Sequence, residues 1–78
     1  MAKKATLEEQ FGDLQALATE TKGLVFTNTF SKKNGKWGFY VFSTKKKIED
    51  VSLTKALAQT IKYISENREK TEEGFKMK

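Results

Sequence analysis

The sequence contains no cysteine and no histidine. Without cysteine there can be no disulfide and no metal held by thiolates. Without histidine the chain lacks the commonest metal ligand and the side chain best suited to proton transfer near neutral pH. There is no glycine-rich phosphate loop, and the adjacent acids of Glu49-Asp50 and Glu72-Glu73 project apart rather than toward one point. We therefore expect a protein that is not an enzyme and that holds no cofactor or metal.

Long hydrophobic runs are also missing. No stretch approaches the roughly 20 apolar residues that a membrane-spanning helix needs, and the segment that begins MAKKATLEEQ lacks the apolar core of a signal peptide. We expect a cytoplasmic protein that does not enter a membrane. The 78 residues suit one small domain, 1–78, which buries only about 60% of its unfolded surface. Its ends, 1–5 and 74–78, are expected to be flexible.

The positive charge is concentrated in the middle of the chain. The net charge is +5, and residues 23–47 carry six lysines and no acid, whereas acids and bases nearly balance in the rest of the chain. A basic excess confined to one segment attracts polyanions. Lysines at the ends of a hairpin also aid solubility and prevent edge-to-edge pairing of strands. The charge pattern alone is compatible with both interpretations.

The first predicted element is a helix over residues 7–22. Thr6 and Glu9 have the spacing of a capping box, in which each residue satisfies a free backbone N–H of the other. Gly23 suits the left-handed position that ends a helix. One apolar stripe follows the helical repeat: Leu7, Phe11, Leu14, Leu17 and Ala18.

The second predicted element is a β-hairpin. Asn34-Gly35 predicts a two-residue turn, which places Phe30 opposite Phe39; a three-residue loop places Thr29 there instead. Alternation then gives the hairpin a core face with Leu24, Phe26, Phe30, Trp37, Phe39 and Val41. The other face is mostly polar and carries Val25, Thr27, Thr29, Ser31, Lys33, Lys36, Tyr40, Phe42 and Thr44.

The third predicted element is a helix that begins after Ser52, with Asp50 as a competing cap, and extends as far as Glu73 before Gly74. Its apolar stripe is Leu53, Leu57, Ile61 and Ile64. A short third strand at residues 46–50 is also compatible with the sequence. The fold class is therefore a small two-layer α+β domain of order α-β-β-α, with an antiparallel hairpin packed against two helices. A two-stranded sheet is marginal alone, so both a monomer and a homodimer joined by edge strands remain open.

The candidate binding residues lie in the segment 31–47, where aromatic side chains lie between two groups of lysines. They are Lys32, Lys33, Lys36, Tyr40, Phe42, Lys45, Lys46 and Lys47. Our first hypothesis is a small protein–protein interaction module that binds an acidic protein surface, of the kind found among phage and mobile-element accessory proteins. The alternative is a single-stranded nucleic-acid-binding protein, in which bases stack on the aromatic rings and lysines neutralise phosphates.

Overall fold

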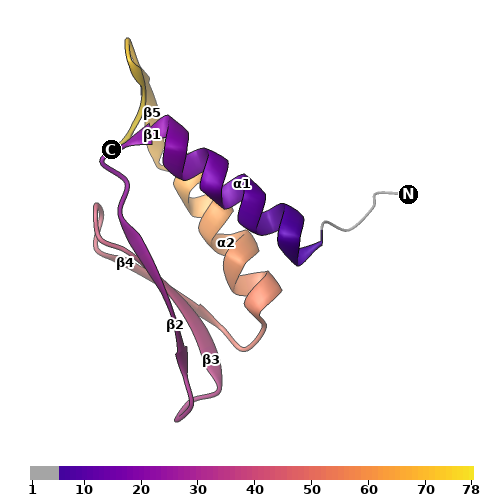
Figure 1. Ribbon diagram of the computed structural model, residues 1–78. Coiled ribbons are helices and arrows are strands. Elements are labelled where there is room, and N and C mark those ends of the chain that lie inside the picture. The colour runs from indigo at the N-terminus through magenta and orange to yellow at the C-terminus, as the bar shows by residue number, and fades with distance from the viewer. Residues whose placement is uncertain (1–5) are drawn as a thin grey trace.

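A computed structural model describes residues 6–78, which form two helices and six strands in two small sheets (Figure 1). The predicted α+β class is confirmed, whereas the expectation for residues 1–5 lies outside the described residues. In chain order the elements are α1 (Leu7–Glu20), β1 (Thr21–Lys22), β2 (Phe26–Ser31), β3 (Lys36–Val41), β4 (Lys46–Asp50), α2 (Leu53–Glu66), β5 (Arg68–Thr71) and β6 (Gly74–Met77). No helix within residues 6–78 is long and apolar enough to cross a membrane.

Helix α1 begins where the sequence predicts but ends two residues early. The Thr6 hydroxyl oxygen accepts the backbone N–H of Glu9 at 3.1 Å, which confirms the N-cap. The helix ends at Glu20 because the next two residues, Thr21–Lys22, leave the helical conformation and pair in parallel with β6. Gly23 does adopt a positive φ of 75°, but it follows this short strand instead of capping the helix.

The β2–β3 hairpin has a longer loop than the sequence predicts. Ser31 lies opposite Lys36, so the loop contains four residues and Phe30 faces Trp37. Neither of the two predicted partners of Phe39, which were Phe30 and Thr29, lies opposite it, so both predictions were wrong. A two-residue type I′ turn needs positive φ at both central residues, and Gly35 has a positive φ whereas Asn34 does not. The chain instead closes a wider turn in which the Gly35 N–H donates to the Ser31 carbonyl at 2.7 Å.

The hairpin faces are nevertheless those that the sequence predicts. The register differs from the expected one by two residues, and side chains alternate with a period of two, so each residue stays on its face. Phe39 and Val41 are 1% and 0% exposed. The third strand is confirmed as β4, and its Ile48 lies buried opposite Phe39. The sheet β2-β3-β4 thus has an inner face, which carries Phe39 and Val41, and an outer face, which carries Tyr40.

The two helices lie on the inner side of this sheet (Figure 1). Helix α2 packs against β3 and β4, and α1 packs against α2. The buried core cluster consists of Leu14, Phe39, Ala56, Leu57 and Ile64. The predicted stripe of α1 is buried only in part, because Leu14 is 2% exposed whereas Leu7 and Phe11 are 37% and 40% exposed. The N-terminal half of α1 therefore presents apolar surface to solvent.

The C-terminal part of the chain differs most from the prediction. Helix α2 ends at Glu66 instead of continuing to Glu73, and the Asn67 side-chain amide donates to the Tyr63 carbonyl at 2.8 Å at its end. The chain then turns into the hairpin β5–β6, so the segment 74–78, expected to be a flexible end, includes β6. Together with β1 these strands form the second sheet, in the order β1-β6-β5.

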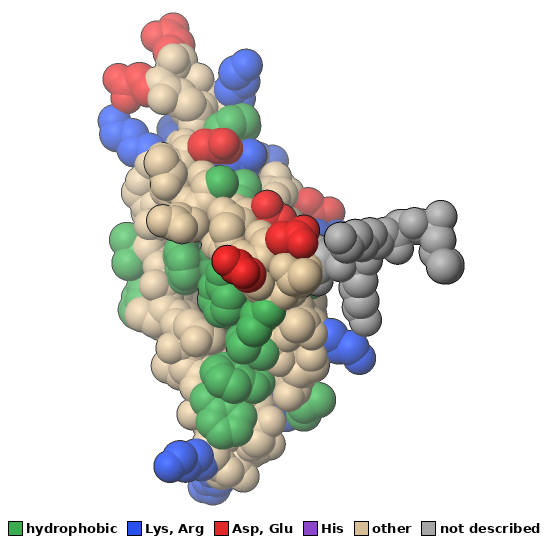
Figure 2. Space-filling view, turned by 45° about the vertical axis from the view of Figure 1, so that its right-hand side comes forward, with side chains coloured by type: hydrophobic (Ala, Val, Ile, Leu, Met, Phe, Trp, Pro, Cys, Tyr) green, Lys and Arg blue, Asp and Glu red, His purple; other side chains and the backbone are tan. Residues whose placement is uncertain are grey.

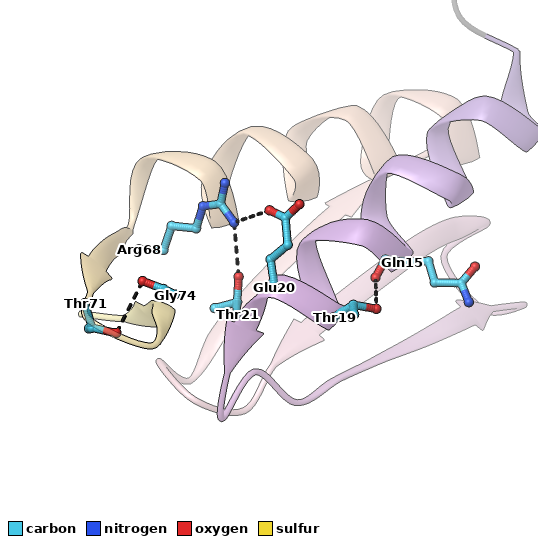
Figure 3. A network of polar contacts seen from close by, with 7 residues as sticks. All are labelled: Gln15, Thr19, Glu20, Thr21, Arg68, Thr71 and Gly74. Carbon is cyan, nitrogen blue, oxygen red and sulfur yellow. Dashed lines mark hydrogen bonds and ion pairs between the residues drawn. The ribbon is translucent and has the colours of Figure 1, made fainter.

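Arg68 joins this second sheet to the end of α1 (Figure 3). Its guanidinium donates to the Glu20 carboxylate and to the Thr21 hydroxyl, both at 3.3 Å. The same group lies 3.7 Å from the centre of the Phe75 ring, and the Arg68 side chain is only 15% exposed. This clamp holds together residues that are far apart in the sequence. It also explains why the charged segment after α2, which the sequence predicts as helix, forms the strands β5 and β6. In this conformation Arg68 reaches β1 and Glu20, which it would not reach from a continued helix.

Candidate functional site

The outer face of the sheet β2-β3-β4 is the face that the helices do not cover (Figure 1). Its middle row runs from Thr29 across Gly38 to Glu49. Gly38 leaves this row without a side chain, and a Cβ atom there would lie 3.4 Å from the Thr29 hydroxyl. An open sheet face of this kind suits contact with another macromolecule better than enclosure of a small molecule.

An exposed apolar cluster lies at one end of the outer face. Phe42 is 50% exposed, Tyr40 is half-buried, and their ring centroids are 4.7 Å apart in an edge-to-face arrangement. Val25 is 56% exposed and lies across from Phe42, whose N–H donates to the Val25 carbonyl at 2.8 Å. We call Val25, Tyr40 and Phe42 the outer-face cluster. Strand alternation placed Val25 on this face, but Val25 was not among the predicted site residues.

The six candidate lysines form two separate groups. Lys32, Lys33 and Lys36 lie at the β2–β3 loop, and Lys45, Lys46 and Lys47 lie at the β3–β4 turn. Strand β3 separates the groups, and its six residues span about 20 Å. The structure therefore does not bring all the predicted residues into one site. Only the second group is close to the outer-face cluster.

Within this second group the lysines have different surroundings. Lys47 lies opposite Tyr40 and so shares the outer face with it. Lys46 lies opposite Val41, on the inner side, and its ammonium is 5.9 Å from the centre of the Tyr63 ring. Lys45 occupies the turn with a positive φ of 55°. Lys45 and Lys47 therefore form the basic rim of the outer-face cluster.

Folding also adds an acid to the outer face. Glu49 comes from outside the basic segment, but β4 places it on this face, where its carboxylate lies 3.6 Å from the Lys47 ammonium. Both side chains are substantially exposed, so the pair adds little to stability. It does reduce the positive potential in the middle of the face. The net charge of residues 23–47 alone therefore overestimates the positive potential of this surface.

The neighbouring acid Asp50 has a structural role. Its carboxylate accepts the backbone N–H of Ser52 at 2.9 Å and the side-chain amide of Gln59 at 3.0 Å. The Ser52 hydrogen bond is the main cause that lowers the pKa of the Asp50 carboxyl below its ordinary value. Asp50 thus supports the start of α2, where Ser52 is the N-cap as predicted.

A second charged region lies on the other sheet, at a hollow lined by Lys22, Thr71, Glu72, Glu73 and Lys76. The Lys22 ammonium and the Glu73 carboxylate pair at 2.8 Å, with both side chains more than 70% exposed. Within residues 6–78 no three acidic side chains are placed together as metal ligands. We interpret this hollow as a solvated ion-pair region.

A comparison of the chain with protein-family models, curated protein sequences and solved structures gives no match. Function must therefore be inferred from the exposed side chains and the charges around them.

Proposed function

We propose that the protein is a cytoplasmic, non-enzymatic protein–protein interaction module that presents the outer-face cluster to an acidic protein surface. The observation that supports this proposal is the exposure of Phe42 and Val25, each at least half exposed, beside Tyr40. Large apolar side chains gathered on one exposed patch mark interaction surfaces. Aromatic anchors surrounded by polar groups are the usual centre of a protein interface.

The basic rim suggests the chemistry of the partner. Lys45 and Lys47 border the cluster, and Lys32, Lys33 and Lys36 lie farther along the same sheet. Such lysines steer an acidic partner toward the surface and fix its orientation, while burial of the aromatic anchor supplies affinity. We therefore expect binding to weaken at high salt and to depend most strongly on Phe42.

Single-stranded nucleic acid is the second candidate, because Tyr40 and Phe42 lie close to lysines. Two features favour the protein partner over it. The two rings meet at 68°, edge against face, so they do not form one continuous platform for stacked bases. The two lysine groups lie at opposite ends of β3, which weakens a continuous phosphate track.

The test is capture of partners from a nuclease-treated extract of the source organism by the immobilised chain. Val51, 69% exposed in the connection between β4 and α2, provides a matched control. An acidic protein should bind the wild type and Val51→Ala equally, and should bind Phe42→Ala and the double variant Lys45→Glu/Lys47→Glu at least about tenfold more weakly. Circular dichroism establishes that each variant is folded. Equal capture by Phe42→Ala would remove the outer-face cluster from the proposal.

A parallel titration separates the two candidate functions. Labelled single-stranded and duplex oligonucleotides are titrated at low and moderate salt. The protein-interaction proposal expects no single-strand binding that depends on Phe42. If single strands bind with a log–log salt slope of about −2 to −4 and Phe42→Ala abolishes that binding, the nucleic-acid function replaces the proposed one.

A further inference from the structure

The first five of the six residues of strand β2 read the same in both directions. Residues 26–30 are Phe-Thr-Asn-Thr-Phe, with Asn28 at the centre. In the sheet order β2-β3-β4, β2 is an outer strand, and within residues 6–78 its second edge has no strand beside it. An antiparallel pair of such strands is chemically symmetric about Asn28. This is the property that an interface between two identical chains around a two-fold axis requires.

The free backbone N–H and C=O groups of β2 belong to the residues that such pairing requires. The Phe42 N–H, one residue beyond β3, donates to the Val25 carbonyl, so this carbonyl points away from the free edge of β2. Because these bonds alternate along an antiparallel strand, Thr27 and Thr29 also bond toward β3. The N–H and C=O groups of Phe26, Asn28 and Phe30 consequently point toward the free edge. These are the three residues on the inner face of the strand.

The two edges of the sheet are protected differently. Strand β4, the other edge, has the sequence Lys-Lys-Ile-Glu-Asp, in which four of five residues are charged. Strand β2 contains no charged residue and no proline among its six residues. Proteins commonly use charge and proline to prevent an edge strand from pairing with another chain. Only β4 has this protection, and two β2 strands brought together place no like charges opposite each other.

Large apolar side chains are exposed both on β2 and on α1. Phe30 is 47% exposed and packs on Trp37, with ring centroids 4.7 Å apart. Phe11 and Leu7 of α1 are 40% and 37% exposed. Figure 2 shows hydrophobic side chains in a band that runs from the middle of the molecule down toward the hairpin end. A second copy that extended the sheet would shield part of this surface from water.

We propose that two copies of the chain pair antiparallel through β2, with the two-fold axis at Asn28, and so join two three-stranded sheets into one. Phe26 then lies opposite the partner subunit's Phe30, Thr27 opposite the partner subunit's Thr29, and Asn28 opposite the partner subunit's Asn28. Aromatic pairs and threonine pairs across strands are both stabilising. A shift by two residues leaves Phe26 without an aromatic partner, so the palindrome also selects the register.

This dimer goes beyond the proposed function, since it uses a different surface. Opposed residues share a sheet face, so both outer faces lie on the same side of the joined sheet. The dimer therefore presents two outer-face clusters to one partner surface, and two linked contacts bind more tightly than one. A monomeric chain could still bind a partner through its single cluster, so the two proposals can fail independently.

The test uses the requirement that residue 28 faces itself. Sedimentation velocity should show a dimer for the wild type, and monomers for both Asn28→Lys and Asn28→Asp, because each variant places like charges at the axis. An equimolar mixture of the two variants should recover the dimer mass, since opposite charges then meet. The control Val51→Lys, on the exposed β4–α2 connection, should remain dimeric.

Several outcomes overturn the proposal. The first is a wild-type chain that stays monomeric at high micromolar concentration. The second is dimer formation by each charged variant alone. The third is a mixture of the two variants that stays monomeric although circular dichroism shows that both are folded. If the charged variants do not fold, Asn28→Cys decides the question. The natural chain has no cysteine, so mild oxidation should cross-link Asn28→Cys to a dimer much faster than Val51→Cys. Equal cross-linking rates contradict the axis at Asn28.

Discussion

The rings of Phe30 and Trp37 lie directly opposite each other in the β2–β3 hairpin, with their centroids 4.7 Å apart and their planes inclined at 46°. The sequence contains no other tryptophan. The emission of Trp37 therefore reports on the packing at this end of the sheet.

Removal of the Phe30 ring should change the fluorescence of Trp37. We expect Phe30→Ala to shift the emission to longer wavelength, because water replaces the ring that covers the indole. Phe42→Ala, on the opposite face of the sheet, should leave the emission nearly unchanged. An unchanged spectrum for Phe30→Ala would contradict the observed register and favour the pairing of Phe30 with Phe39.

Truncation of core side chains should cost much more than truncation of Tyr40. Phe39 and Leu57 are 1% and 0% exposed. We expect Phe39→Ala to lower the free energy of unfolding by about 3–5 kcal/mol and Leu57→Ala by about 2–5 kcal/mol. Tyr40→Ala should cost clearly less, because Tyr40 is half-buried on the outer face. Urea denaturation measures all three, and an equal loss at Tyr40 would place that side chain in the core.

Arg68 should hold the second sheet against the end of α1. We expect Arg68→Lys to accelerate amide hydrogen exchange in β5 and β6, because lysine lacks the planar group that both stacks on Phe75 and donates to Glu20. Exchange in β3 should change little. Lys76→Ala is the control, since Lys76 forms only an exposed pair with Glu69 at 3.6 Å. Equal protection of β5 and β6 in wild type and Arg68→Lys would show that the clamp does not stabilise this sheet.

Asp50 should make stability depend on pH in the acid range. Its pKa is lowered in the folded chain from an ordinary value of 3.8. A carboxyl with a lowered pKa stabilises the fold above the unfolded value, and this contribution disappears as the pH falls through the folded value. We therefore expect wild type to lose stability below about pH 4 more steeply than Asp50→Asn, which has no charge to lose. Thermal unfolding between pH 2.5 and 7 gives the dependence of stability on pH for both proteins. An equal dependence in wild type and Asp50→Asn would exclude this role of the Asp50 carboxylate.

The candidate site was only partly predictable from the sequence. Strand alternation placed Tyr40 and Phe42 together on the outer face because a side-chain period of two is a local property of the backbone. The contribution of Val25 and the division of the six lysines into two groups were not predicted from the sequence. The sequence alone could not place Glu49 beside Lys47 either, since that contact depends on the pairing of β3 with β4.

The sequence by itself determined the local features of this protein. The Thr6 cap, the apolar stripe of α2 and the hairpin faces follow from hydrogen bonds and periodicities that span a few residues. The strand at residues 46–50 was only compatible with the sequence, and its pairing with β3 makes it β4. Tertiary structure alone decided where both helices end and that residues 68–77 form strands. Arg68 meets Glu20 across 48 positions of the chain, and β6 pairs with β1. Such partners override the helical preference of a charged segment because backbone hydrogen bonds and the partly buried Arg68 guanidinium then stabilise the strands.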